Sequence, residues 1–189
     1  MKLIDQLELF LKITGSYTIA RRYFIVNGFD GVLTILGIIM GFYISGLTNT
    51  EVMINACLGA AIALSVSGLT SAYVSETAER QNSLRQLEQA MVSDLAESAH
   101  GKAARFIPAL IALVNGLSPL LLSLLIISPL WFADHLPMSP LPVVIGAALT
   151  VIFFLGILLG QISGVFWLWS GLRTLLIAAA TCGIILLLD

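Results

Sequence analysis

Charged residues are scarce in this sequence: Asp, Glu, Lys and Arg make up 11% of its 189 residues, whereas hydrophobic residues make up 58%. Water-soluble domains carry about 25% charged residues, so an ordinary soluble domain is excluded. The two cysteines, Cys57 and Cys182, fall inside apolar runs and form neither a disulfide framework nor a metal motif. The sequence holds two histidines, no Gly-x-Ser-x-Gly motif, no phosphate-binding loop and no basic patch for nucleic acid. We therefore expect neither an enzyme nor a nucleic-acid-binding protein.

Long apolar runs are the main feature that the sequence does have. Five of them are long enough, or nearly so, to cross a hydrocarbon core about 30 Å thick. The sequence thus predicts an all-α integral membrane protein with membrane lipid as its solvent. The five transmembrane helices are expected at roughly 22–46, 52–75, 106–131, 141–163 and 167–188.

Two further segments are predicted to be helical. Apolar residues recur at helical spacing near the start of the chain, which predicts an amphipathic helix over residues 1–20 that lies on the membrane surface. Residues 76–105 are predicted to form a cytoplasmic helical linker that continues the second span and ends near Gly101. Residues 21–189 are expected to form a single five-span domain.

The basic residues predict the orientation of the chain. With the N-terminus in the cytoplasm, all nine Lys and Arg residues lie inside, and the two outside loops, near 47–51 and 132–140, hold none. This asymmetry follows the positive-inside rule and places the C-terminus outside. The first 20 residues mix acids and lysines with apolar positions, so we expect no cleavable signal peptide. These features favour a prokaryotic inner membrane.

Asp30 is the only acidic residue inside an apolar run. It lies about 12 Å along its predicted helix, too deep for a short side chain to reach water. An aspartate at this depth costs about 2.5 to 3.5 kcal/mol, so it marks a functional site by default. Gly28 and Gly31 beside it, followed by Gly37 and Gly41, allow a helix or ligand to approach closely. The alternative is a packing helix whose acid is buried against a polar neighbour.

Polar residues also occur in the second and third spans. Ser67 and Thr70 either line a polar path or donate hydrogen bonds to backbone carbonyls of their own helix. Pro119 removes the helical hydrogen bond to Asn115, which either prepares an ion site or fits a bend in the bundle. Met40, in the first span, is predicted to lie near the face of the aspartate and to add a soft ligand.

The predicted linker carries grouped acids. Three of its residues, Asp94, Glu97 and His100, are expected to be successive neighbours on one helical face. A Glu-x-x-His pair on a helix binds a divalent metal when a second helix or subunit supplies more ligands. The alternative is a solvated charged face. The candidate metal ligands of this region are Glu76, Glu79, Glu88, Asp94, Glu97 and His100.

Four motifs together carry a resemblance to a known family. They are Asn27 to Gly31 after a basic pair, Ser67 to Tyr73, Gly116 to Pro119, and Gly160 to Gly164. In this order, over residues 20–189, the sequence resembles the vacuolar iron transporter family, whose members transport Fe2+ and Mn2+. The first motif is the specific one.

The resemblance implies a dimeric five-helix fold that exports divalent metal from the cytoplasm in exchange for protons. It implies a pathway between the first two helices of each subunit, with Asp30 as the pathway aspartate, and a cytoplasmic region that collects metal. Two positions that carry ligands in the family look like Ala60 and Gly68 here. The cytoplasmic region is also much shorter than the family's.

The leading hypothesis is a homodimer, joined through the first span, that transports a divalent transition metal with proton coupling. Asp30 of each subunit would lie near the two-fold axis, where an arriving cation displaces protons shared by the two carboxylates. The alternatives are a non-transporting membrane scaffold or sensor, and a transporter of a different cation or small solute. The predicted pathway residues are Asp30, Asn27, Gly31, Met40, Ser67, Thr70 and Asn115.

Overall fold

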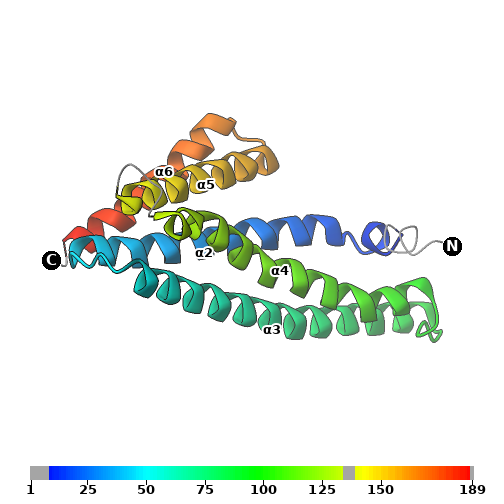
Figure 1. Ribbon diagram of the computed structural model, residues 1–189. Helices are drawn as coiled ribbons and strands as arrows, with labels where there is room; N and C mark the ends of the chain where they lie inside the picture. Colours follow the sequence, from blue (N-terminus) through cyan, green and yellow to red (C-terminus); the bar gives the residue numbers. More distant parts are fainter. Residues whose placement is uncertain (1–8, 134–138, 188–189) are drawn as a thin grey trace. The chain divides into compact units, whose positions relative to one another are not determined.

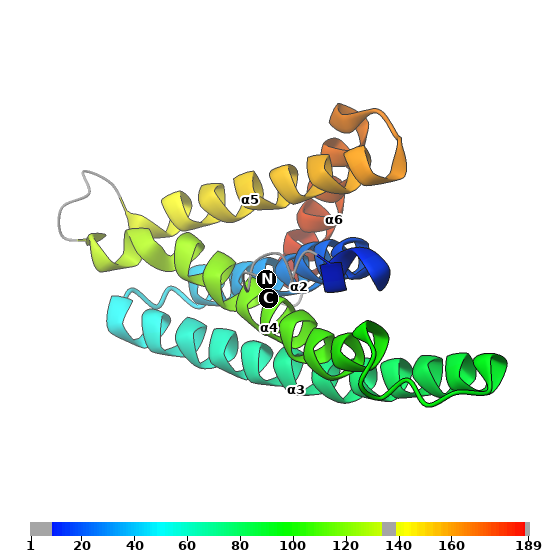
Figure 2. The ribbon, with the colours of Figure 1, turned by 90° about the vertical axis from the view of Figure 1, so that its right-hand side faces the viewer.

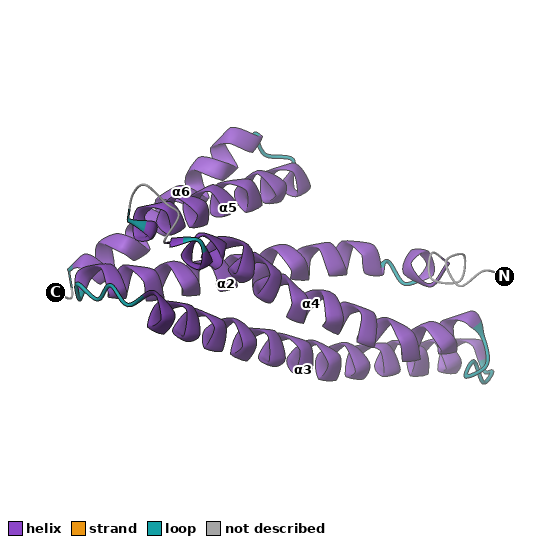
Figure 3. Ribbon diagram, in the orientation of Figure 1, coloured by secondary structure: helices purple, strands orange, loops and turns teal. Residues whose placement is uncertain are grey.

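The computed structural model describes residues 9–133 and 139–187, and this part of the chain contains helices and no strands (Figure 3). A short helix over residues 9–13 precedes the first long one. The long helices are α2 (Ser16–Ile44), α3 (Thr50–Met91), α4 (Ala99–Trp131), α5 (Pro140–Ser163) and α6 (Trp167–Leu186).

Each of the five long helices is long and apolar enough to cross a membrane, which confirms that five such helices are present and indicates a multi-pass membrane protein. Helix α3 has 42 residues, which at 1.5 Å per residue gives about 63 Å. A hydrocarbon core needs about half of that length. The helix therefore continues well beyond its apolar stretch, as the sequence predicts for the start of the linker.

The chain divides into two compact units. The first unit consists of Met1–Phe24 and Val66–Leu117, and the second consists of Ile25–Ser65 and Ser118–Asp189. Helices α2, α3 and α4 each contribute residues to both units. The two units are described separately below.

The core of the second unit is apolar and contains residues of all five long helices. The helix that carries Asp30 approaches α4 closely within it. A Cβ atom on Gly28 would lie 2.7 Å from Ser118 Oγ, and one on Gly31 would lie 2.8 Å from the Cα of Pro119. The predicted close approach at these two glycines is therefore confirmed, and its partner is helix α4.

Helices α5 and α6 form a hairpin within the second unit (Figures 1 and 2). Gly164 ends α5 in the left-handed conformation, with φ of 68°, which favours glycine. A Cβ on Gly156 would meet Gly171 Cα at 3.0 Å, and one on Gly160 would meet Ser170 Cβ at 2.6 Å. Gly156 and Gly160, four residues apart, thus form a packing face of α5, with α6 as its partner.

The first unit contains the end of α3 and the start of α4, which lie side by side next to their connection (Figures 1 and 2). Its apolar core includes Ala103, Ile107 and Ile111 of α4, with Phe10 and Leu11 packed against them. The apolar side of the short N-terminal helix thus contacts α4. Its predicted location on the membrane surface stays a prediction.

The linker departs from its prediction at one point. Helix α3 ends at Met91, not near Gly101, and α4 begins at Ala99. The side chain of Ser98 accepts a hydrogen bond from the backbone N–H of Gly101 at 3.2 Å, so Ser98 caps the start of α4. A Cβ on Gly101 would clash with the carbonyl oxygens of Leu95 and Ala96. Glycine is needed there for close packing of the turn, and it does not end a helix.

Three predictions fall partly on residues outside the described part of the chain. They concern residues 1–8 of the N-terminal helix, residues 134–138 of the second outside loop, and residues 188–189 at the C-terminus.

Replacing Gly31 by Ala is expected to lower the free energy of unfolding by about 1 to 3 kcal/mol. The new methyl group would lie against the backbone of Pro119, which cannot rotate away. SDS-induced unfolding in mixed micelles measures the effect. Gly41→Ala, in the same helix, is the control, because a Cβ on Gly41 would meet no atom of a neighbouring helix within 4 Å. It is expected to leave the free energy of unfolding unchanged or slightly higher. Equal stability of both variants would contradict the close packing of α2 on α4.

Candidate functional site

Asp30 is exposed on helix α2. Its backbone carbonyl accepts a hydrogen bond from the Thr34 hydroxyl at 2.8 Å. Within residues 9–133 and 139–187 the ion pair present joins Glu76 and Arg80, so no basic nitrogen lies within 4 Å of the Asp30 carboxylate. Asp30 is therefore exposed on the surface of the described chain, with no positively charged side chain within 4 Å of its carboxylate.

The packing of α2 explains this outward position. Gly28 and Gly31 are buried on the side that contacts α4, and Asp30 lies about 200° around the helix from Gly28 and about 100° from Gly31. Asn27, before this pair, is half-buried. Within the described part of one chain, Asp30 is thus not buried against a polar neighbour, and the alternative of an acid with only a packing role stays open.

Asp30 borders a cavity in the second unit. The cavity has a volume of about 170 Å³ and lies between α2, α5 and α6. Its wall is apolar apart from Asp30 and Thr174. Thr174 is buried, and its hydroxyl donates to the carbonyl of Gly171 at 2.8 Å, with Ile152 O at 3.2 Å.

Met40 does not share the exposed side of Asp30. Its side chain is 6% exposed and belongs to the apolar core of the second unit. Ten residues of α-helix place the two positions about 80° apart around the axis. The prediction that Met40 lies near the face of Asp30 is therefore wrong, and in this chain the thioether fills the core.

Ser67 and Thr70 are both exposed on α3, in the first unit. The Thr70 hydroxyl donates to Val66 O at 2.8 Å, with Ser67 O at 3.1 Å. For Thr70, the alternative of a hydrogen bond to the backbone of its own helix is therefore the observed one. A role for either residue in a pathway stays a prediction.

Asn115 joins α4 to α3 within the first unit. It is buried, and its Nδ2 donates to the backbone carbonyl of Gly68 at 2.7 Å. A Cβ on Gly68 would lie 3.3 Å from both Nδ2 and the carbonyl oxygen of Asn115. Gly68 thus allows this close contact between the helices, which gives a packing role to both residues.

Glu76 forms a buried polar network in the first unit. It is 7% exposed, and its Oε2 lies 3.6 Å from Nε of Arg80, one helical turn later. The Tyr23 hydroxyl donates a hydrogen bond to the Glu76 carboxylate. Arg80 also donates to Thr14 O at 3.2 Å and to Ser16 Oγ at 3.0 Å. The network ties the start of α2 to α3, so Glu76 is not part of a solvated face.

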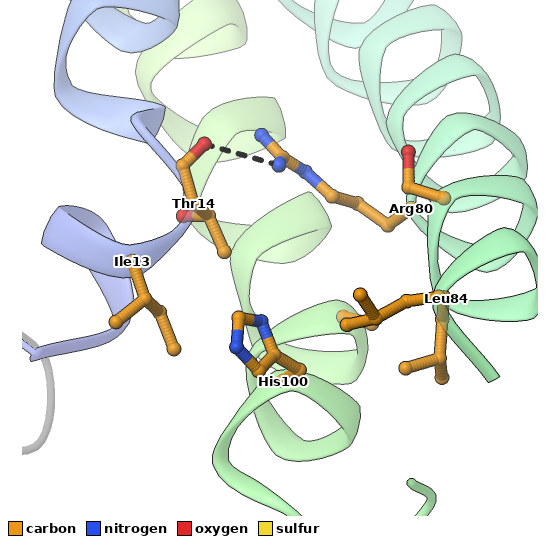
Figure 4. Close-up of a pocket in the computed structure, with 8 residues that line it drawn as sticks. Ile13, Thr14, Arg80, Leu84 and His100 are labelled. Atoms are coloured by element: carbon orange, nitrogen blue, oxygen red, sulfur yellow. Dashed lines mark hydrogen bonds between the residues drawn. The ribbon is translucent and has the colours of Figure 1, made fainter. Parts of the chain in front are cut away.

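Arg80 also lines a pocket of about 230 Å³ in the first unit (Figure 4). The hydrogen bond from Arg80 to Thr14 closes one side of it, and His100 and Leu84 lie across the remaining space (Figure 4). His100 is the predicted metal ligand that borders this pocket, and no acidic residue lines it. The pocket therefore does not combine the predicted metal ligands.

The other acids of the linker are separated. Asp94 and Glu97 lie in the turn between α3 and α4, while His100 is in the first turn of α4, so their predicted placement on one helical face is wrong. Glu88 accepts from Leu95 N at 3.1 Å and Asp94 from Ala96 N at 2.8 Å, which shapes the turn. Glu79 is exposed on α3. Over the described residues no three His, Cys, Asp or Glu side chains form a group that could hold a metal ion.

Comparison with known proteins gives one relative. Uncharacterized protein MJ0645 of Methanocaldococcus jannaschii is 30% identical over 155 residues, which span 80% of this chain and 79% of that protein. The chain belongs to the family of this protein. No family model matches the chain, and no solved structure matches it. The resemblance to the vacuolar iron transporter family stays a prediction.

Sequence reasoning missed two features of these sites. The four-residue spacing of Glu76 and Arg80 is a signal for an ion pair on one helix, and it was available in the sequence. The place of Thr174 in the wall of the cavity that Asp30 borders had no such signal, because this cavity brings together α2 and α6 across more than 140 residues.

Replacing Arg80 by Met is expected to lower the free energy of unfolding by about 3 to 5 kcal/mol, because it leaves the Glu76 carboxylate buried without its counter-charge. SDS-induced unfolding measures the loss. The double variant Glu76→Met with Arg80→Met removes both charges and is expected to recover part of it. Arg85→Met, at an exposed position of the same helix, serves as the control. Equal losses in Arg80→Met and Arg85→Met would show that the pair is solvated.

Proposed function

We propose that this protein is a homodimeric membrane transporter of divalent transition-metal cations of the Fe2+ and Mn2+ class. The observation that carries the proposal is the exposed Asp30 carboxylate on an apolar helix. An acid in this setting costs about 2.5 to 3.5 kcal/mol unless a partner or a cation compensates it. A transported cation supplies that compensation during each transport cycle.

A second copy of the chain would complete the metal site. Divalent cations need several ligands, and the described residues of one chain bring no three candidate ligands together. Because Asp30 is exposed on α2, contact between two α2 helices would bring two carboxylates to one cation. Protons shared by these carboxylates would leave when the cation binds, which couples metal movement to proton movement.

The orientation proposed for the chain follows from its charges. The distribution of basic residues favours an N-terminus in the cytoplasm, and we propose a prokaryotic inner membrane with the C-terminus outside. Metal would then leave the cytoplasm as protons enter. The acids of the linker, Glu79 and Glu97 among them, are exposed and would raise the local concentration of cations near the pathway.

A non-transporting scaffold or sensor is the second candidate. Gly68 packs against Asn115, so a position that carries a ligand in the resembling family is committed to helix packing here. A transporter of a different cation or small solute is the remaining alternative, and a panel of solutes separates it from the first.

The test is uptake of Fe2+, Mn2+, Co2+ and Zn2+ into proteoliposomes that contain a pH-sensitive dye. For the native protein we expect metal uptake with opposite proton movement, and for Asp30→Asn at least a tenfold lower rate. Glu51→Gln, which changes an exposed acid in the first turn of α3, is the control and is expected to retain the native rate. Mass measurement in detergent checks the dimer.

Two results would count against the proposal. Unchanged metal uptake by Asp30→Asn would show that Asp30 does not take part in metal transport. No uptake of any metal by a folded native dimer would favour the scaffold or sensor.

A further inference from the structure

The cavity beside Asp30 is built by one chain. Helix α2 contributes Phe29 and Asp30, and the hairpin of α5 and α6 contributes residues that include Leu159, Thr174 and Ile177. All of these residues belong to the second unit. The cavity lies among three helices that are long and apolar enough to cross a membrane, so we expect lipid at its mouth in a single copy of the chain.

The charged and polar residues at the cavity determine which ligands can bind there. Asp30 is the charged residue among those that line it, and the Thr174 hydroxyl donates to the backbone of its own hairpin. Arg173, next to Thr174, is exposed but forms no ion pair with Asp30 within 4 Å. The remaining wall is apolar. A ligand that fits must therefore present one positive charge and an apolar body.

We propose that this cavity binds an amphiphilic organic ammonium ion, whose charged nitrogen pairs with Asp30 and whose alkyl chain lies against the apolar wall. A cavity of about 150 Å³ is known to admit a molecule of the size of benzene, so 170 Å³ holds the ammonium group and its first methylene groups. The rest of the chain extends into lipid.

Other ligand classes fit the cavity less well. A divalent metal needs several oxygen, nitrogen or sulfur ligands, whereas the cavity wall is apolar apart from Asp30 and Thr174. An anion is repelled by Asp30, and a neutral amphiphile leaves the acid unpaired. The ion pair with an ammonium gains strength because the surroundings are apolar. This binding requires neither a second copy of the chain nor a metal, so it does not depend on the proposed transport function.

The test is equilibrium binding of radiolabelled decylammonium to the full chain in phosphatidylcholine nanodiscs, in metal-free buffer with a chelator. Binding to empty nanodiscs is subtracted. Decanol, which has the same alkyl chain without the charge, is the comparison ligand. We expect saturable binding of decylammonium, with decanol at least tenfold weaker, and at least a tenfold loss of decylammonium affinity in Asp30→Asn.

A second pair of variants tests the cavity without changing the acid. Ile177→Trp places a large side chain at the cavity wall and is expected to weaken decylammonium binding at least tenfold. Ile184→Trp is the matched control, because Ile184 is an exposed residue two turns later on α6 that does not line the cavity. It is expected to bind as the native chain does.

Three results would overturn the proposal: equal affinity for decylammonium and decanol, native affinity in Asp30→Asn, or native affinity in Ile177→Trp. If Asp30→Asn does not fold, the Ile177→Trp and Ile184→Trp pair still decides the outcome. Saturable decylammonium binding by a chain that transports no metal would uphold this inference while the transport proposal fails. Metal transport by a chain that does not bind decylammonium would uphold the transport proposal and overturn this inference.

Discussion

The structure depends on how an apolar helix bundle accommodates carboxylates. Two acids of this chain show two solutions. Glu76 is buried and stabilised by Arg80 and by the Tyr23 hydroxyl, so its charge is compensated inside the first unit. Asp30 has no counter-charge within 4 Å in the described chain and is exposed on α2. The first arrangement stabilises the fold, whereas the second is the basis on which we propose that Asp30 binds a cation from outside the chain.

Close helix packing sets the position of Asp30. Gly28 and Gly31 allow α2 to meet Ser118 and Pro119 of α4, and this contact fixes the rotation of α2 about its own axis. A large side chain at either glycine would push α2 and α4 apart, and the contact would then no longer fix the rotational position of α2. The glycines next to the acid thus act on it through packing, and the outward direction of Asp30 follows from the residues that turn inward.

Much of the fold was predictable because hydropathy over 20 or more residues reports burial in lipid directly. The helix end at Met91 was not, since Leu84, Leu87, Met91 and Leu95 continue a helical spacing across it. The decisive interactions are local hydrogen bonds: Glu88 and Asp94 accept from the turn and Ser98 caps α4. Apolar periodicity contains no information about such caps, so the predicted row of Asp94, Glu97 and His100 was divided between the turn and α4.

The site was predictable only at Asp30 itself, because an acid in an apolar run is a single-residue signal. Its surroundings depend on contacts between distant helices, which is why Met40 was misplaced and Thr174 was missed. The packing of Gly68 against Asn115 shows the same limit. A side chain with a metal ligand at position 68 would have to displace Asn115 from its buried hydrogen bond. A metal ligand at position 68 would therefore require α3 and α4 to repack. Asp30 differs from this position because it is exposed on α2, so the cation proposed here could reach it without repacking of the helices.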